Sequence, residues 1–317
     1  MPSWSKGGLK LFSRKAQDRF AYMLMGMLAW CAVMLVPGML VALYLRARPL
    51  LDGTSLGQLL LARQWSPMKG QFGFFPFLMG TLWVTFLAMA LAIPPCFLSA
   101  IYLAEYAPRW LRQAAKPMVD LLAGIPSVVY GLWGILAVVP FLREVIIEGL
   151  AERLGSISWL RAANPTGYSV MAGGIVLAVM VSPIIISTVE EVLRAVPQGQ
   201  REAALALGAT QWQVVKSVVV RRAMPGIIAA VMLGFSRAFG ETMAVMMVVG
   251  NVAQIPRSPF DAAYPLSALI ANNYGEMMSI PLYDAALMTA ALLLLLTILV
   301  FTILARIVLL QSLKEVM

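Results

Sequence analysis

Two charged side chains stand in the middle of a long apolar stretch of the sequence. Arg237 and Glu241 lie in a run, about residues 226–249, that is otherwise almost free of charge. A charge at the centre of a bilayer costs from ~2.5 to over 10 kcal/mol, and intramembrane charges mark substrate paths, ion relays or buried pairs. If the run is one helix, the spacing of four places both side chains on the same face. The pair is therefore the first candidate for transport chemistry.

A guanidinium at this depth is suited to binding an anion. Arg237 can offer a fork of donors to anionic oxygens, and Glu241 can hold the guanidinium when no anion is bound. The structural alternative is an ion pair that only locks helices together. Arg followed by Glu is the poorer order for supporting a helix, so we favour a functional role.

A polar segment just before this run has the pattern of a docking loop. Residues 200–207 are good helix formers, and Gly208 suits a left-handed turn at the end of that helix. Thr210 with Gln213 matches a capping box, which predicts that a second helix begins there. Small residues at the bend would let another protein approach closely. An amphipathic connection in the membrane interface is the alternative for the same pattern.

Several blocks of this sequence resemble a known family. Glu202, Ala203 and Ala204, followed after three residues by Gly208, resemble the EAA loop of ABC-importer permeases. Three further blocks resemble phosphate-importer permeases of the PstC type: YLAEYAPRWLR (102–112), GIPSVVYGLWG (124–134) and SRAFGETMAVMMVVGN (236–251). The EAA pattern alone is typical of any ABC importer, whereas the last block is much more specific.

The resemblance implies an ATP-driven phosphate importer. This chain would form half of the translocation pathway, beside a second permease of the PstA type. Two cytoplasmic ABC ATPase subunits and an external phosphate-binding protein would complete the assembly. The residues implied for ATPase coupling are Arg201, Glu202, Ala203, Ala204 and Gly208. The residues implied for the phosphate pathway are Arg237, Glu241, Thr242, Ser127 and Tyr130.

The chain itself carries no signature of ATP hydrolysis. It contains no G-x-x-x-x-G-K-[ST] pattern, the loop that cradles phosphates with backbone N–H groups. It has no histidine, and its two cysteines, Cys31 and Cys96, show no metal-binding spacing. We therefore expect a transport subunit that is not an enzyme and has no cofactor of its own. ATP and magnesium would bind to the partner ATPase.

Composition places the chain among polytopic membrane proteins. Of its 317 residues, 61% are hydrophobic and 12% are charged, against about 25% charged in soluble domains. The net charge of +9 could suggest nucleic acid as a partner. The basic residues flank apolar runs, however, which indicates contact with membrane lipid and a role in topology rather than nucleic-acid binding.

The elements that must position these residues are six apolar spans in a single membrane domain, about residues 20–309. The fold class is thus an all-α membrane protein with six transmembrane helices. A basic tail (1–19), a coupling loop (about 190–225), a short C-terminal tail (310–317) and polar loops complete the chain. Each span is long enough for a bilayer core of ~30 Å. The predicted spans are about 20–45, 76–103, 117–142, 168–189, 226–249 and 284–309.

The third span is rich in small and helix-breaking residues, among them Gly124, Pro126, Gly131 and Gly134. Such residues indicate either close helix packing, which is more common, or the lining of a path.

The basic residues also predict an orientation. Fifteen of the 24 lysines and arginines lie in the two tails, the second loop and the coupling loop, counting Arg306 near the end of the last span with the C-terminal tail, and eight lie in the other three loops. By the positive-inside rule both termini and the coupling loop are expected in the cytoplasm of a bacterium, with the spans in its inner membrane.

Three rival functions fit parts of this pattern. One is a permease for another oxyanion, such as molybdate or sulfate. Another is an ion-coupled secondary transporter, in which Arg237 and Glu241 would form the relay. The third is a membrane scaffold, which would gain nothing from central charges. The EAA-like loop favours the ATP-driven importer, because a secondary transporter has no ATPase to dock.

Overall fold

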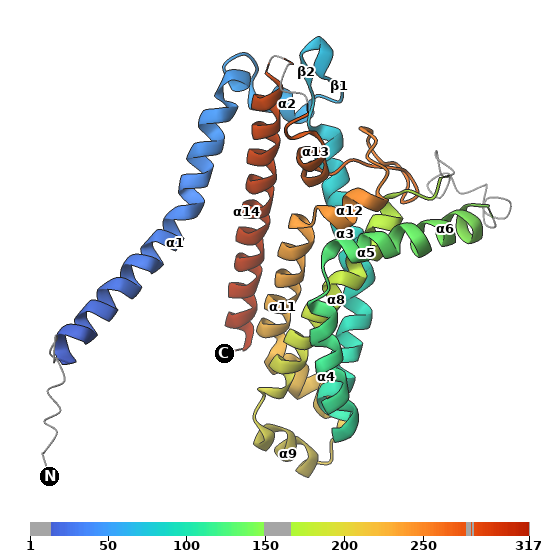
Figure 1. Cartoon of the computed structure of the whole chain (residues 1–317). Helices are drawn as coiled ribbons and strands as arrows, with labels where there is room; N and C mark the ends of the chain where they lie inside the picture. Colours follow the sequence, from blue (N-terminus) through green and yellow to red (C-terminus); the bar gives the residue numbers. More distant parts are fainter. Residues whose placement is uncertain (1–13, 149–165, 277–279, 281, 317) are drawn as a thin grey trace, which may run out of the picture.

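The computed structural model is a helical bundle, and it describes residues 14–148, 166–276, 280 and 282–316 (Figure 1). In this part of the chain six helical segments are long and apolar enough to cross a membrane, which confirms the predicted all-α class with six spans. They are Asp18–Leu51, Phe75–Tyr106, Ser127–Val145, Val170–Arg194, Gln211–Gly240 and Tyr283–Gln311. Most of the predicted tail 1–19 lies outside the described residues, as does the end of the tail 310–317.

The first helix, α1 (Arg14–Leu51), leans away from the rest of the bundle (Figure 1). It meets α14 (Tyr283–Val316) near its C-terminal end, where Ala47 packs with Met288 and Leu292. Most of its apolar side chains are exposed. In a membrane these side chains would contact lipid.

The segment between the first two predicted spans is not a plain loop. After α1 it forms α2 (Leu56–Leu61) and an antiparallel pair of short strands, β1 (Trp65–Ser66) and β2 (Gln71–Phe72), joined by a turn of 3-10 helix, η1 (Pro67–Lys69). The ring of Trp65 packs edge-on against the ring of Phe77 at a centroid distance of 4.9 Å. Aromatic burial therefore orders a segment that its polar residues suggested would be irregular.

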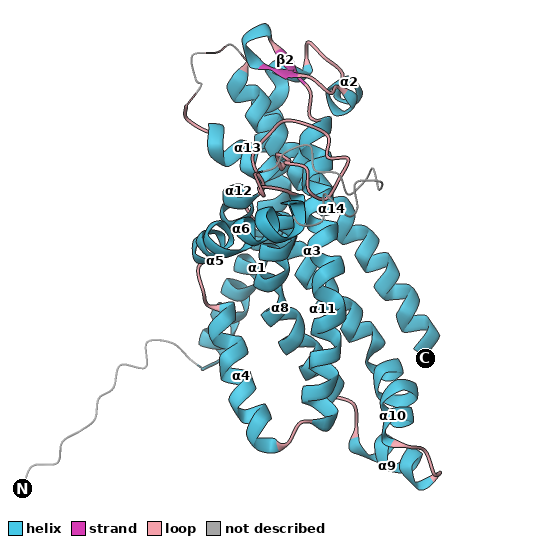
Figure 2. Cartoon of the chain, turned by 90° about the vertical axis from the view of Figure 1, so that its right-hand side faces the viewer, coloured by secondary structure: helices cyan, strands magenta, loops and turns pink. Residues whose placement is uncertain are grey.

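The centre of the bundle is the contact between α3 (Phe75–Ile101) and α8 (Val170–Arg194), with α11 (Val220–Gly240) packed on α8 (Figure 2). Gly174 allows the close approach of the first two helices, because a Cβ there would lie only 3.1 Å from Leu87 Cγ on α3. The helix α3 continues without a break through Pro94 and Pro95 and runs on as a π-helical turn, η2 (Tyr102–Tyr106).

The third predicted span, 117–142, is divided in the structure. The helix α4 (Arg109–Ala123) ends at Gly124, and Pro126 caps the next helix, α5 (Ser127–Trp133). Proline removes a backbone donor and disfavours a helical conformation in the residue before it, which accounts for the break. The apolar segment then continues through η3 (Gly134–Val138), α6 (Val139–Phe141) and η4 (Leu142–Glu148).

The fifth predicted span, 226–249, is divided as well. A continuous segment of α10 (Gln211–Val214), the π-helical turn η6 (Val215–Val219) and α11 ends at Gly240. Glu241 is extended, with ψ of 127°, and α12 (Met243–Val248) begins two residues later. Arg237 therefore lies in the last turn of α11, not at mid-span. The expected helical i, i+4 relation between Arg237 and Glu241 does not hold.

The chain between α12 and α14 folds back over the start of α8. It carries α13 (Leu266–Asn273), and the carbonyls of Pro259 and Asp261 accept hydrogen bonds from the backbone of Met171 and Val170. Non-helical backbone is tolerated at membrane depth only where its polar groups are satisfied in this way.

Two glycines of the third span, Gly131 and Gly134, act in packing. A Cβ at Gly134 would meet Val248 Cγ1 at 2.6 Å and Val176 Cγ2 at 2.7 Å, so these positions sit at a close contact between helices. This agrees with the packing interpretation of the small residues.

Replacing Gly134 with alanine should therefore destabilise the bundle. Valine side chains in helices have one strongly preferred rotamer, so the backbone rather than a side chain must yield. We expect a loss of ~1–3 kcal/mol in the free energy of unfolding, measured as a lower melting temperature in detergent. Gly38→Ala is the control, because no atom lies within 4 Å of a Cβ there. Equal melting temperatures for the two variants would contradict this packing.

Candidate functional site

A short helix, α9 (Gln198–Ala206), lies at the end of the molecule opposite β1 and β2 (Figure 1). The chain leaves it through Gly208, whose φ of 85° lies in the left-handed region that favours glycine. Thr210 Oγ1 accepts the N–H of Gln213 at 3.4 Å, and Gln213 Oε1 accepts the N–H of Thr210 at 2.8 Å. The predicted left-handed turn and capping box are thereby confirmed.

The outer surface of this helix–turn–helix unit combines polar and apolar side chains. Glu202 and Ala203 are exposed, and Leu207 is 90% exposed at the turn. Trp212, just after the turn, is 54% exposed. An exposed apolar cluster rimmed by polar residues is typical of a protein-interaction surface.

The five predicted coupling residues take different places. Glu202 and Ala203 face outward, whereas Ala204 is half-buried and packs against the main hydrophobic core. Gly208 forms the turn. Arg201 points inward and is only 16% exposed. Glu202 and Ala203 are thus open to a partner, whereas Arg201 belongs to the interior side of α9.

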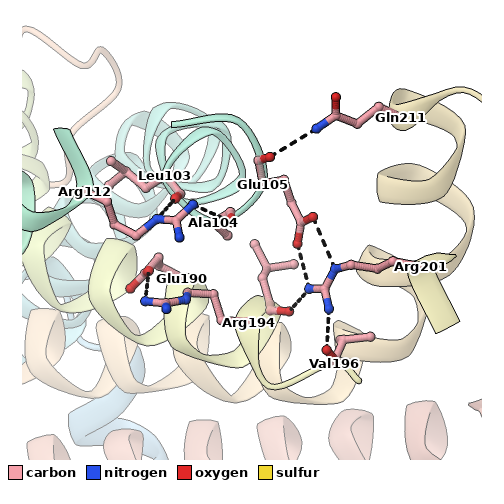
Figure 3. Close-up of polar contacts among 10 residues, drawn as sticks. Leu103, Ala104, Glu105, Arg112, Glu190, Arg194, Val196, Arg201 and Gln211 are labelled. Carbon is pink, nitrogen blue, oxygen red and sulfur yellow. Dashed lines mark hydrogen bonds and ion pairs between the residues drawn. The ribbon is translucent and has the colours of Figure 1, made fainter. Parts of the chain in front are cut away.

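Arg201 joins α9 to two other helices (Figure 3). Its Nη2 lies 2.8 Å from Glu105 Oε1 and its Nε donates to Glu105 Oε2 at 3.3 Å, so the carboxylate in η2 is held by two bonds. Its remaining donors reach the carbonyl oxygens of Leu193, at 2.9 Å, and Val196, both at the C-terminal end of α8. Bidentate, charge-assisted bonds of this kind are the strong ones in proteins.

Glu105 was missing from the residues selected from the sequence. It lies 96 positions before Arg201, so no local pattern connects the two. The only signal was its place inside the block 102–112 that carries the family resemblance. Its backbone carbonyl also accepts a bond from Gln211 Nε2 at 3.1 Å, so Glu105 contacts both arms of the helix–turn–helix unit.

A second arginine stabilises the same end of α3. Arg112 donates to the carbonyl oxygens of Leu103, Ala104 and Ala107, at 2.8, 3.2 and 3.2 Å. These carbonyls belong to the π-helical turn and the residue that follows it. A guanidinium at a helix C-terminus satisfies orphan acceptors and suits the negative end of the helix dipole.

The turn between α11 and α12 contains three of the predicted pathway residues. Glu241 Oε1 accepts the N–H of Ala244 at 3.1 Å and so caps α12, and its carbonyl accepts the hydroxyl of Ser267 at 3.0 Å. Thr242 is half-buried and begins α12. Arg237 is exposed and makes no hydrogen bond or ion pair with any residue that the structure describes. The expected Arg237–Glu241 pair is therefore not formed.

Tyr130 is brought to this turn by the packing of α5 on α12. The approach is close, because a Cβ at Gly131 would meet Met247 Sδ at 2.5 Å and Ala244 Cα at 3.2 Å. The Tyr130 hydroxyl donates to the carbonyl of Leu122 at 2.9 Å, across the break between α4 and α5. Ser127 is half-buried in the first turn of α5, and none of the contacts among the described residues joins it to Arg237.

Aromatic rings support the turn from the other side of α11. Phe235 and Phe239 are buried and pack against Phe301 of α14 at centroid distances of 4.7 and 5.0 Å. The bulky face of α11 is thus in packed core, while Arg237 is directed away from it. An unpaired guanidinium at membrane depth is tolerated only toward water or a neighbouring polar surface.

A comparison with family models matches residues 96–310 to the family "Binding-protein-dependent transport system inner membrane component". This range includes α4 to α14, the α9 unit and the α11–α12 turn.

Individual relatives extend the match over nearly the whole chain. A phosphate transport system permease protein PstC from Xylella fastidiosa is 34% identical over 98% of this chain and 95% of its own length. The protein of the same name from Haemophilus influenzae is 38% identical over 69% of this chain and 71% of its own.

The fold is also found in solved structures. A chain of the MetNI methionine ABC transporter, in an inward-facing conformation, superposes with a TM-score of 0.56 at 20% identity, over 78% of this chain and 99% of that one. A chain of a bacterial alginate ABC transporter superposes with the same TM-score at 17% identity. The chain belongs to the binding-protein-dependent transport system inner membrane component family and, within it, to the PstC-type permeases.

Proposed function

We propose that this chain is the permease subunit of an ATP-driven phosphate importer and forms half of its translocation pathway. The observation that carries the proposal is the match to PstC proteins, which extends over 98% of the chain for the Xylella fastidiosa relative. A second permease of the PstA type, two ATPase subunits that bind ATP and Mg²⁺, and an external phosphate-binding protein complete the assembly. The family match leaves the secondary transporter without support, because members of this family work with a binding protein.

The α9 unit is the docking site for the ATPase. The exposed Glu202, Ala203 and Leu207 supply a surface that is partly charged and partly apolar, as a protein interface requires. The end of the molecule that carries α9 therefore faces the cytoplasm. The N-terminal end of α1 and the C-terminal end of α14 both point toward the end of the molecule that carries α9 (Figure 1). This agrees with the distribution of basic residues.

The turn between α11 and α12 lies on the phosphate path. Arg237 supplies an unpaired fork of donors, Thr242 supplies a hydroxyl, and α5, which carries Tyr130 and Ser127, packs on α12. Glu241 has a structural part in this turn, because its carboxylate accepts the backbone N–H of Ala244 and so holds the start of α12. The path is completed by the second permease, which would cover the exposed side of Arg237.

Valine in place of Gly208 should impair coupling. A β-branched residue in a left-handed conformation costs about 1–3 kcal/mol, so the turn would shift and displace Leu207. We expect phosphate uptake in cells, at matched membrane levels, to fall several-fold. Gly199→Val is the control, since Gly199 lies in α9 with open space around it and without a positive φ. Full ATP-driven uptake by Gly208→Val would refute the docking assignment.

Arg237 variants should lose uptake according to their hydrogen-bonding geometry. Arg237→Lys keeps the charge and loses the fork, so we expect uptake to fall about tenfold or more, as a lost bidentate contact of ~1.5–3 kcal/mol would cause. Uptake by the Arg237→Gln variant should fall further. The control is Arg48→Gln, which removes an exposed arginine paired with Asp52 in α1. Wild-type uptake by Arg237→Gln would exclude Arg237 from the path.

Glu241 variants separate the cap from the charge. Glu241→Gln keeps an oxygen that can accept the Ala244 N–H, whereas Glu241→Ala removes it. We therefore expect Glu241→Ala to lower the free energy of unfolding by ~1 kcal/mol and Glu241→Gln to leave it nearly unchanged. Thermal melting of the purified complex is the measurement. Equal melting temperatures for the two variants would show that the Glu241 cap does not contribute to the free energy of unfolding.

A further inference from the structure

The ion pair between Arg201 and Glu105 has the properties of a fixed joint. Both side chains are largely buried, at 16% and 9% exposure, and both carboxylate oxygens are bound by one guanidinium. Two bonds with parallel geometry fix the orientation of the groups as well as their distance. By contrast, the neighbouring pair Arg194–Glu190 has a single contact at 3.2 Å, and its arginine is 49% exposed.

The joint connects elements that are far apart in sequence. Through Arg201, the base of α9 is tied to η2 at the end of α3 and to the carbonyls of Leu193 and Val196 at the end of α8 (Figure 3). Gln211, on the other arm of the unit, is tied to the Glu105 backbone. Both arms of the helix–turn–helix unit thus meet at one residue of the second span.

The covalent route out of α9 is a tight turn through Leu207, Gly208 and Ala209. Gly208 and Ala209 donate their N–H groups to the carbonyls of Leu205 and Ala204, at 2.9 and 3.2 Å, so the turn leads from α9 to α10 and α11. No hydrogen bond among the described residues joins this turn to η2. The buried bidentate pair gives displacement of α9 a second, direct route to η2 and α3, and it cannot rotate without losing its bonds.

We propose that the Arg201–Glu105 pair is the joint that transmits movement of α9 to the second span, and that Glu105 is a positioning residue for coupling. The proposal rests on the proposed function, since it takes α9 to be the surface that the ATPase moves. In this view Arg201 does not contact the ATPase. It holds the contact helix α9 on the spans, so that ATPase closure displaces α3 and α8 together.

The functional test uses the complete complex of both permeases and both ATPases in proteoliposomes, with phosphate-binding protein and inorganic phosphate. The readout is the stimulation factor, which is the ATPase rate with loaded binding protein divided by the rate without it. We expect Glu105→Gln and Arg201→Lys each to lower this factor about tenfold. The double variant Glu105→Arg with Arg201→Glu should recover part of the loss. Arg194→Lys is the matched control and should keep the wild-type factor.

Each outcome decides the proposal. Wild-type stimulation in both single variants would overturn it. Failure of both single variants to assemble would also count against it, because the pair would then serve folding alone. If the wild-type complex responds to another anion and not to phosphate, the proposed substrate is wrong, and the same variants test the joint with that anion.

A distance measurement tests the joint directly and does not depend on transport. Spin labels at Gly199 in α9 and Tyr102 in η2, both exposed, report the separation of the two elements in a chain with Cys31 and Cys96 replaced by alanine. In the intact complex we expect one narrow distance distribution that is the same with and without ATP. In Glu105→Gln the distribution should broaden when ATP binds. A wild-type distance that changes with ATP would overturn the proposal.

Discussion

A break of a helix at membrane depth has to be compensated by hydrogen bonds from within the protein. In a membrane no water replaces a lost backbone bond, so each helix end requires a specific acceptor or donor. Glu241 supplies it at the start of α12, and Ser169 at the start of α8, where its Oγ accepts the N–H of Ala172 at 3.2 Å. Arg112 supplies a donor to the carbonyls at the end of η2, and the Tyr130 hydroxyl supplies a donor at the break between α4 and α5. The breaks in α4–α5 and α11–α12 depend on these few polar side chains.

The same constraint explains where the candidate functional residues lie. An interruption of a span leaves backbone groups that polar side chains must satisfy, and it is also the place where a polar group can reach a path through the membrane. Glu241 and Thr242 define such an interruption, and Arg237 stands one turn before it. At the other end of the molecule, Arg201 donates to two backbone carbonyls at the end of α8. The residues at these interruptions and helix ends are therefore also the ones from which transport chemistry or coupling is expected.

Much of the fold could be predicted from the sequence because its signals are local. Apolar runs give the six spans, Gly208 gives the left-handed turn, and Thr210 with Gln213 gives the cap that follows. The span boundaries were less accurate. A hydropathy pattern registers Gly240 to Thr242 as a minor dip in an apolar run, although the backbone there leaves the helix.

The candidate site was predicted in part, for a related physical reason. Residues inside one motif, such as Glu202 and Ala203, were found because their spacing is visible. Glu105 was missed because its partner is 96 residues away, and only the packing of α3 on α8 brings the two together. The inward direction of Arg201 follows from the same packing and has no counterpart in the sequence pattern of α9.

The oblique course of α1 has a consequence for how the protein meets membranes of different thickness. Its apolar run, residues 20–45, has 26 residues, which at ~1.5 Å per residue is about 39 Å of helix for a hydrocarbon layer of ~30 Å. A helix of that length must tilt or extend beyond the layer. Because the buried residues of α1 among those the structure describes, Ala47 and Leu50, lie near its C-terminal end, its tilt can follow the bilayer while the packed helices around α3 and α8 keep their arrangement. Hydrophobic mismatch is thereby taken up by one peripheral helix.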